Sequence, residues 1–439
     1  MIRQARRGLL GVAALAAAAL AAAGCGSGSS GTPSATPSSS ATVSTSPGAG
    51  GAGQQSVTDY LTYTGGKAGK ANPSLPPVYI GWINQQGGQQ QIGPLATDGA
   101  QLAVKYVNGE AGGIDGHPVV LKTCYITSAE EEGTTCGQKF AADKSVSVID
   151  EGAVAIGIQS FYSTIGTTKP VIVGVATTPV DSVQKNAMIM FGDVTHVLGP
   201  FGTYAKDVLH AKTAALVYPN IAGITQGATA IAQSLQKAGV TVKKVGYDEA
   251  ETDLIGPLTS AGAQTADMVI PYSESSGCVN LAKGLKELGI TDTKKIVSAP
   301  LCLNSQVMAG LGGDFPIWTY AIASSLFGDK TDPGVPPYLK AAQTYGDAKN
   351  APDPWNLVAF SQMLTTVRFL NQVGYAHITP QGILAKATAF TGPVALGAPE
   401  LQCGKYTDAP AVCNDRTQFF DYKGKFEFAK AAGWLQPPP

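Results

Sequence analysis

Aromatic, amide and hydroxyl side chains follow short apolar runs at several places in the sequence. Such runs are typical of buried strands, and in open α/β sheets ligands bind beyond the carboxyl ends of the strands. Aromatic rings beside a few polar groups provide the apolar walls and directed hydrogen bonds of a small-molecule pocket. The candidate ligand-binding residues are Trp82, Gln85, Ala153, Val154, Ala176, Thr177, Tyr218, Asn220, Tyr272 and Glu274.

The charge of the chain indicates the kind of ligand and excludes some partners. No Lys or Arg follows these strands, so we expect a neutral or zwitterionic solute rather than a polyanion. Charged residues make up 14% of the 439 residues, and the formal net charge is −1. With so weak a field, neither nucleic acid nor an acidic lipid surface is an expected partner.

Residues that could support catalysis or bind a metal are scarce. The four histidines (His117, His196, His210 and His377) have no second histidine and no cysteine at helical spacing that would complete a metal site. The sequence contains no nucleophile elbow at a strand–helix junction and no phosphate-binding loop, because Gly65-Gly66-Lys67-Ala68-Gly69-Lys70 lacks the hydroxyl residue. We therefore expect a binding protein without a cofactor, and a secreted hydrolase is the weaker alternative.

The elements that would position the candidate site alternate between strand and helix. Apolar runs such as Val78–Ile83, Pro170–Ala176 and Thr213–Tyr218 alternate with segments of helical spacing. Repeated βαβ units predict parallel sheets covered by helices on both faces. The strands are too many for one small sheet, so the predicted fold is α/β with two doubly wound, Rossmann-like lobes, a hinge and a ligand cleft between the lobes.

The cysteines indicate an oxidising compartment. Of the seven cysteines, six remain if Cys25 is modified, and six allow 15 pairings. The order of the predicted elements makes neighbours of three pairs, and we expect disulfides there: Cys124–Cys136, Cys278–Cys302 and Cys403–Cys413.

The N-terminus has the features of an export signal. Arg3, Arg6 and Arg7 precede an apolar run that is too short to span a membrane comfortably. The run ends in Ala22-Ala23-Gly24-Cys25, which resembles the lipobox of bacterial lipoproteins and implies a lipid on Cys25. An ordinary secretory signal with an incidental cysteine is the alternative. The Gly-, Ser- and Pro-rich segment that follows favours a disordered tether.

The order of these motifs resembles a known family. Residues 98–108 form a predicted helix, Gly112-Gly113-Ile114-Asp115-Gly116 a turn, and Pro170–Pro179 a strand with its loop. This series, over residues 76–434, is similar to the type I periplasmic binding proteins of the branched-chain amino acid, amide and urea transporters. The resemblance implies two lobes joined by three crossovers, with the ligand held between them.

The resemblance also implies roles for individual residues. In family members that bind amino acids, hydroxyl residues after the third and fourth strands hold the carboxylate, and a second-lobe acid holds the amine. Thr177 matches the hydroxyl position after the fourth strand. Gly152-Ala153-Val154-Ala155 lacks the hydroxyl after the third strand, although its backbone N–H groups could bind an anion. Pro300-Leu301 occupies the position of the acid, for which Glu274 is a substitute.

Together these features predict an extracytoplasmic binding lipoprotein of an ABC importer. Its expected partners are a small molecule and membrane permease subunits, and it is expected to be a monomer anchored to the outer face of the cell membrane. A ligand-sensing receptor component of the same fold is the alternative. The predicted organisation is a signal peptide (1–24), a disordered tether (25–75), lobe I (76–192 and 325–390) and lobe II (193–324 and 391–434).

Overall fold

The computed structural model of the chain describes residues 56–88 and 93–439. The predicted signal peptide, Cys25 and the tether as far as residue 55 lie outside the described residues. Within the described part, the polypeptide forms two lobes, each with its own sheet and its own core on both faces of that sheet.

The first lobe contains a five-stranded parallel sheet. Its parallel order follows from the helices between consecutive strands, since a parallel crossover needs about a dozen residues or more. Because both faces are covered, the central strands are almost continuously apolar. In the order β2-β1-β3-β4-β5, the strands are β2 (Val119–Ile126), β1 (Val78–Gln85), β3 (Val146–Glu151), β4 (Val171–Val173) and β5 (Ala187–Ile189).

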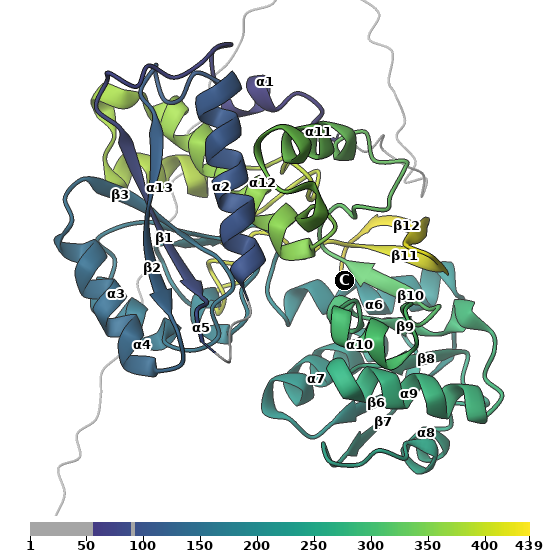
Figure 1. The fold of residues 1–439 in the computed structure, drawn as a ribbon. Coiled ribbons are helices and arrows are strands. Elements are labelled where there is room, and N and C mark those ends of the chain that lie inside the picture. Colours follow the sequence, from purple (N-terminus) through teal and green to yellow (C-terminus); the bar gives the residue numbers. More distant parts are fainter. Residues whose placement is uncertain (1–55, 89–92) are drawn as a thin grey trace, which may run out of the picture. The chain divides into compact units, whose positions relative to one another are not determined.

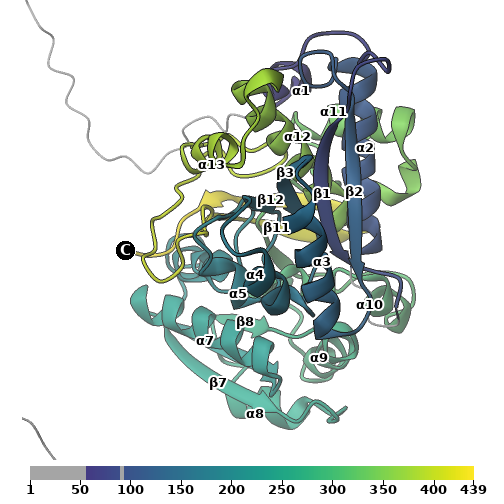
Figure 2. The same cartoon turned by 90° about the vertical axis from the view of Figure 1, so that its left-hand side faces the viewer.

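Helices cover both faces of this sheet. One face packs against α2 (Pro94–Glu110), α11 (Val335–Tyr345), α12 (Pro354–Val373) and α13 (Pro380–Thr388). The other face packs against α3 (Glu130–Ala142), α4 (Ile158–Ile165) and α5 (Pro179–Ser182). Figure 1 shows α2 beside α12, and Figure 2 shows α2 along β1 and β2. The two helices approach closely at Gly99, where a Cβ would lie 2.1 Å from the carbonyl oxygen of Asn356.

The second lobe contains one sheet, which is made of two groups of hydrogen-bonded strands. A parallel bridge between Val269 and Ile296 joins the group β7-β6-β8 to the group β9-β10-β11-β12. The last two strands form an antiparallel hairpin at the edge. The strands are β6 (Thr213–Pro219), β7 (Thr241–Tyr247), β8 (Met268–Pro271), β9 (Val297–Ser298), β10 (Thr319–Ile322), β11 (Thr417–Gly424) and β12 (Glu427–Leu435).

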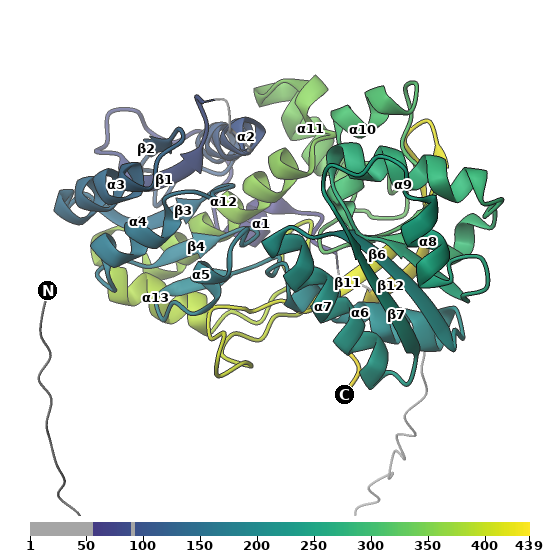
Figure 3. The same cartoon turned by 90° about the horizontal axis from the view of Figure 1, so that it is seen from below.

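Helices again cover both faces of the second sheet. In Figure 3, α7 (Ala222–Lys237) and α8 (Ile255–Ala261) lie on opposite sides of β6. Strand β6 serves both cores by alternation, because Val217 packs with the α8 side and Leu216 with the α7 side. The other helices are α6 (Pro200–Thr203), α9 (Ser275–Glu287) and α10 (Ser305–Gly310).

Short helical turns complete the connections. They are η1 (His196–Leu198), η2 (Tyr204–Val208), η3 (Thr293–Lys295), η4 (Pro300–Cys302), η5 (Ala348–Asn350) and η6 (Tyr375–His377). Among residues 56–88 and 93–439, no helix combines the length and apolar character needed to span a membrane.

A short N-terminal helix, α1 (Tyr60–Thr64), belongs to the first lobe, although the sequence placed it in the tether. Tyr60 and Tyr63 are buried in the lobe's core. The hydroxyl of Tyr60 donates to the carbonyl of Gly334 at 2.7 Å, and Tyr63 shares a 2.8 Å hydrogen bond with Thr365. Apolar area is thus buried at both rings, and the folded body begins well before the expected residue 76.

The chain passes between the lobes three times. The crossings are near residues 192–196, after β5, near 323–326, after β10, and near 413–417, before β11. The last crossing lies later than expected, because residues 391–416 pack on the first lobe. Val412 forms a parallel bridge with Ile189 of β5, and Leu401 and Cys413 are buried in the first lobe's core. This segment covers the β5 edge that would otherwise expose unpaired backbone groups.

Candidate functional site

The carboxyl ends of β1, β3 and β4 meet at one edge of the first sheet, because these strands are adjacent and parallel. Two loops form this edge, the β3–α4 loop (residues 152–157) and the β4–α5 loop (residues 174–178). Ala153, Val154 and Ala176 lie in these loops and are fully buried, whereas Thr177 is partly exposed. The structure therefore brings these four predicted residues together, but most of their side chains face inward.

Trp82 lies behind the loops rather than at the surface. Its side chain is 0% exposed, and its indole N–H donates to Thr97 Oγ1 of α2 at 2.9 Å. A Cβ on Gly152 would lie 2.8 Å from the Trp82 ring, so the ring packs directly against the β3–α4 loop. Trp82 thus supports the loop from inside the core and has no exposed surface for ligand contact.

Gln85 and its neighbour Asn84 bind the β3–α4 loop through their amide oxygens. Asn84 Oδ1 accepts from the N–H of Ala153 at 3.0 Å. Gln85 Oε1 accepts from the N–H groups of Ala155 at 2.9 Å and Ile156 at 3.2 Å. Both amides are buried, so these bonds hold the loop in one conformation. The sequence identified Gln85 but not Asn84.

Thr177 links the two loops of the site. Its hydroxyl donates to the carbonyl of Val154, which fixes the β4–α5 loop against the β3–α4 loop. The neighbouring Thr178 is the N-cap of α5 and accepts from the N–H of Val180 at 3.3 Å. Thr177 therefore has a structural bond as well as partial exposure at the edge.

Glu130, the first residue of α3, was missed by the sequence reasoning, and its carboxylate lies at the N-terminus of α4. Its carboxylate accepts from the N–H of Gly157 at 2.7 Å and from both the N–H and the hydroxyl of Ser160, at 2.9 and 2.8 Å. Burial opposes ionisation, but the hydrogen bonds from Ser160 and Gly157 outweigh it and lower the pKa of Glu130. The negative charge is also favourable beside the positive end of the helix dipole.

Two buried carboxyl groups lie beneath these loops. Glu151 ends β3, Asp181 belongs to α5, and both are 0% exposed. Burial and the nearby charge of Asp181 raise the pKa of Glu151 well above its usual range, and burial raises the pKa of Asp181 to about 6. Tyr162 donates to Glu151 at 3.3 Å. Among the described residues, Glu151 Oε1 and Asp181 Oδ1 have no hydrogen-bond donor, and we expect the two acids to share a proton.

This acid pair makes the stability of the first lobe depend on pH. An acid whose pKa is raised by folding stabilises the native state at low pH and loses that contribution as the pH rises through the folded pKa. We expect Glu151→Gln, which cannot ionise, to gain stability relative to the native protein by about 1–2 kcal/mol between pH 6 and pH 8. Urea unfolding at several pH values measures this difference.

The control is Glu131→Gln, which removes a carboxylate from an exposed position on α3. Its effect on the free energy of unfolding should change little over the same pH interval. A Glu151→Gln effect that is equally constant would contradict the shared proton.

In the second lobe, the predicted aromatic residues also belong to the core. Tyr218 and Tyr272 are 7% and 3% exposed, and both pack in the cluster beneath α7. At Gly227 of α7, a Cβ would lie 2.1 Å from the Tyr272 hydroxyl oxygen. Asn220 and Glu274, by contrast, are exposed at the ends of β6 and β8. These two side chains are available to a ligand.

A small hollow lies beside Glu274, between the first turns of α9 and the helix α10. Its volume is about 250 Å³. The lining residues, none of which the sequence identified, are Ser275, Ser276, Val279, Asn280, Gln306 and Gly310. A larger hollow of about 470 Å³, between α2 and residues 346–356, contains none of the predicted site residues.

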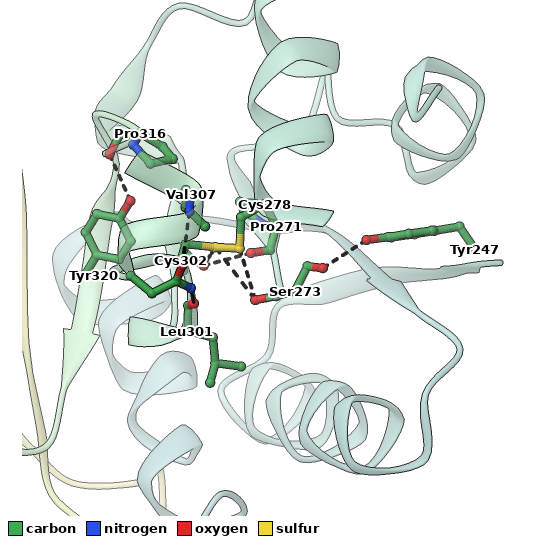
Figure 4. The surroundings of a disulfide bond; sticks show 11 residues. Tyr247, Pro271, Ser273, Cys278, Leu301, Cys302, Val307, Pro316 and Tyr320 are labelled. Atoms are coloured by element: carbon green, nitrogen blue, oxygen red, sulfur yellow. Dashed lines mark hydrogen bonds between the residues drawn. A yellow bond between two sulfur atoms is a disulfide. The ribbon is translucent and has the colours of Figure 1, made fainter. Parts of the chain in front are cut away.

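The three predicted disulfides are confirmed by the structure. They join Cys124 to Cys136, Cys278 to Cys302 and Cys403 to Cys413. Figure 4 shows the second of them, buried between the start of α9 and the turn after β9. The described residues contain no group of three or more His, Cys, Asp or Glu arranged to hold a metal ion.

Comparison with known proteins gives the class of the chain. Residues 77–405 match the family model described as periplasmic binding protein, and this chain belongs to that family. The family consists of extracytoplasmic solute-binding proteins rather than enzymes, and its type I fold has the two lobes described above. No curated protein matched the sequence.

Solved structures share the fold at low sequence identity. An ABC transporter substrate-binding protein from Sphaerobacter thermophilus is 14% identical, with a TM-score of 0.65 over 82% of this chain and 98% of that chain. A branched-chain amino acid transporter substrate-binding protein from Streptococcus pneumoniae, in complex with isoleucine, is 17% identical, with a TM-score of 0.60 over 81% and 99%. A solute-binding protein from R. palustris, in complex with benzoate, is 16% identical, with a TM-score of 0.59 over 82% and 98%.

Proposed function

We propose that this protein is the extracytoplasmic substrate-binding component of an ABC importer. It captures a small neutral or zwitterionic solute between its lobes and delivers it to the permease subunits as a monomer. The main support is the family match over residues 77–405, together with two doubly wound sheets joined by three crossings. Structural neighbours are themselves named as ABC transporter binding proteins.

The crossings supply a hinge suited to this role. Asp193, in the first crossing, accepts from the N–H of His196 at 2.7 Å and from the hydroxyl of Ser182 at 2.6 Å. In the last crossing, Thr417 donates to the carbonyl of Val197 at 2.7 Å. Short segments held in this way can concentrate rotation in a few residues, so that lobe closure traps the ligand and excludes water.

Among the residues chosen from the sequence, we propose direct ligand contacts for Thr177, Asn220 and Glu274. These side chains retain exposed surface at strand ends. Trp82 and Tyr272 are assigned to the support of the site, because they are buried behind its loops.

A thermal-shift screen of amino acids, amides, urea derivatives and aromatic compounds, followed by X-ray scattering, tests the proposal. A bound solute should raise the melting temperature and reduce the radius of gyration, and it should be recovered chemically unchanged. Chemical conversion of the solute, or binding without contraction, would contradict the role.

We further propose that Cys25 carries the lipid that anchors the mature protein to the outer face of the membrane. Two acyl chains on one residue give stable membrane binding, whereas a single chain is marginal. We expect Cys25→Ala to appear in the medium or to accumulate unprocessed, while Ser27→Ala should fractionate with membranes like the native protein. Membrane fractionation and mass spectrometry of the mature N-terminus measure both. A Cys25→Ala variant that is processed and membrane-bound as usual contradicts lipidation.

A further inference from the structure

The backbone donors at the first lobe's site are already used by side chains of the chain itself. In the β3–α4 loop, Asn84 accepts a hydrogen bond from the N–H of Ala153, and Gln85 accepts from the N–H groups of Ala155 and Ile156. Glu130 accepts hydrogen bonds from the N–H of Gly157 and from that of Ser160 in the first turn of α4. An incoming carboxylate would have to displace these bonds, and removing such acceptors leaves buried donors unsatisfied.

The charges around the strand ends also disfavour a ligand carboxylate. In the second lobe, the loops after β7 and β8 contain five acidic residues and no Lys, Arg or His; the acids are Asp248, Glu249, Glu251, Asp253 and Glu274. In the first lobe, the loops after β1, β3 and β4 contain no basic residue, and the Glu130 carboxylate lies against the N–H groups of Gly157 and Ser160. A negative local potential disfavours an anionic group and favours a neutral or cationic one.

We infer that the ligand carries no free carboxylate and is instead a neutral amide or an amine, and that Gln85 and Glu130 are the residues that exclude carboxylates. This inference rests on the proposed function and changes its solute class, because it excludes zwitterions with a free carboxylate and admits cationic amines. The two side chains act by accepting the backbone N–H groups to which a ligand carboxylate would otherwise bond. Of the exposed side chains proposed to contact the ligand, Glu274 is a carboxylate that can only accept, which suits an N–H or ammonium group, whereas Thr177 and Asn220 can both donate and accept.

Calorimetry with matched probes tests the ligand class. The probes are isoleucine and isoleucinamide, and benzoate and benzamide, because isoleucine and benzoate are bound by two structural neighbours. In the native protein, the amide of a pair should bind at least about tenfold more tightly than the acid, which corresponds to the loss of one hydrogen bond to a charged group. An acid that binds as tightly as its amide overturns the inference.

Variants test the role of the two residues. Gln85→Ala combined with Glu130→Ala frees the loop donors, and benzoate affinity should rise about tenfold or more. Glu131→Ala removes a charge from the same turn of α3 without freeing any of these donors and should leave benzoate affinity unchanged. Since Gln85 is buried, Glu130→Ala alone is measured as well, with a smaller expected gain. Folded variants, checked by circular dichroism, that show no gain overturn the inference.

The outcomes also separate this inference from the proposed function. If only the ligand class is wrong, the native protein binds a carboxylate and contracts in X-ray scattering. If the importer role is wrong, no solute in the wider screen produces contraction, in either the native protein or the variants.

Discussion

Trp82→Ala should lower the free energy of unfolding by about 3–5 kcal/mol, the usual loss for a buried aromatic residue truncated to Ala. The ring is fully buried in the core between β1 and α2, and its N–H bond to Thr97 is lost as well. Because the ring also packs against Gly152, we expect the β3–α4 loop to loosen and ligand affinity to fall as a secondary effect. Urea unfolding monitored by circular dichroism measures the primary effect.

Trp82→Phe is the matched control. It retains most of the buried apolar area but leaves Thr97 without the indole donor, so it should cost much less than the Ala variant. A Trp82→Ala protein with native stability and lost ligand binding would show that the ring belongs to the ligand surface instead.

Replacing both Cys278 and Cys302 with Ser should lower the free energy of unfolding by about 2–4 kcal/mol, because the unfolded chain loses a constraint on its entropy. The two residues are 24 positions apart and buried, so the native packing around them also suffers. Their sulfur atoms lie 3.2 and 3.7 Å from the carbonyl oxygen of Ser273, which directly precedes Glu274. Chemical unfolding under non-reducing conditions measures the loss.

The pair Cys403–Cys413 provides the comparison, since it spans only 10 positions. Loop-closure entropy predicts that removing this disulfide lowers the free energy of unfolding by about 0.8 kcal/mol less than removing Cys278–Cys302, which closes the longer loop. Peptide mapping of the native protein should find all three pairs oxidised. Free thiols, or the same unfolding curve for all variants, would contradict the structural role of these bonds.

The sequence predicted the fold well because its signals are local and repeated. Alternating apolar runs and helical segments predict parallel sheets, and six cysteines in neighbouring elements predict the three disulfides that the structure contains. The same reasoning wrongly placed α1 in the disordered tether, because two tyrosines in a polar segment form too short an apolar pattern to indicate a helix. The local signals were nevertheless present, because Asp59 caps the helix and Gly65 ends it.

The site was harder to predict, for two physical reasons. In a sheet covered on both faces, an aromatic residue of a strand faces a core whichever side it takes, so Trp82 and Tyr218 were read as ligand walls although both are buried. The second reason is distance along the chain. Gln85 bonds to Ala155 and Glu130 to Gly157 only after folding brings these segments together, and no local pattern marks such pairs.

The position of α1 has a mechanical consequence. A pulling force applied to the polypeptide ahead of Val57 is carried by α1 into α12, because Arg368 donates to the carbonyl of Tyr63 and Asn371 to that of Thr64, both at 2.9 Å. The buried rings of Tyr60 and Tyr63 add further contacts to the same attachment. Tension on the N-terminus is therefore borne by the first lobe, and the second lobe remains free to move without strain on that attachment.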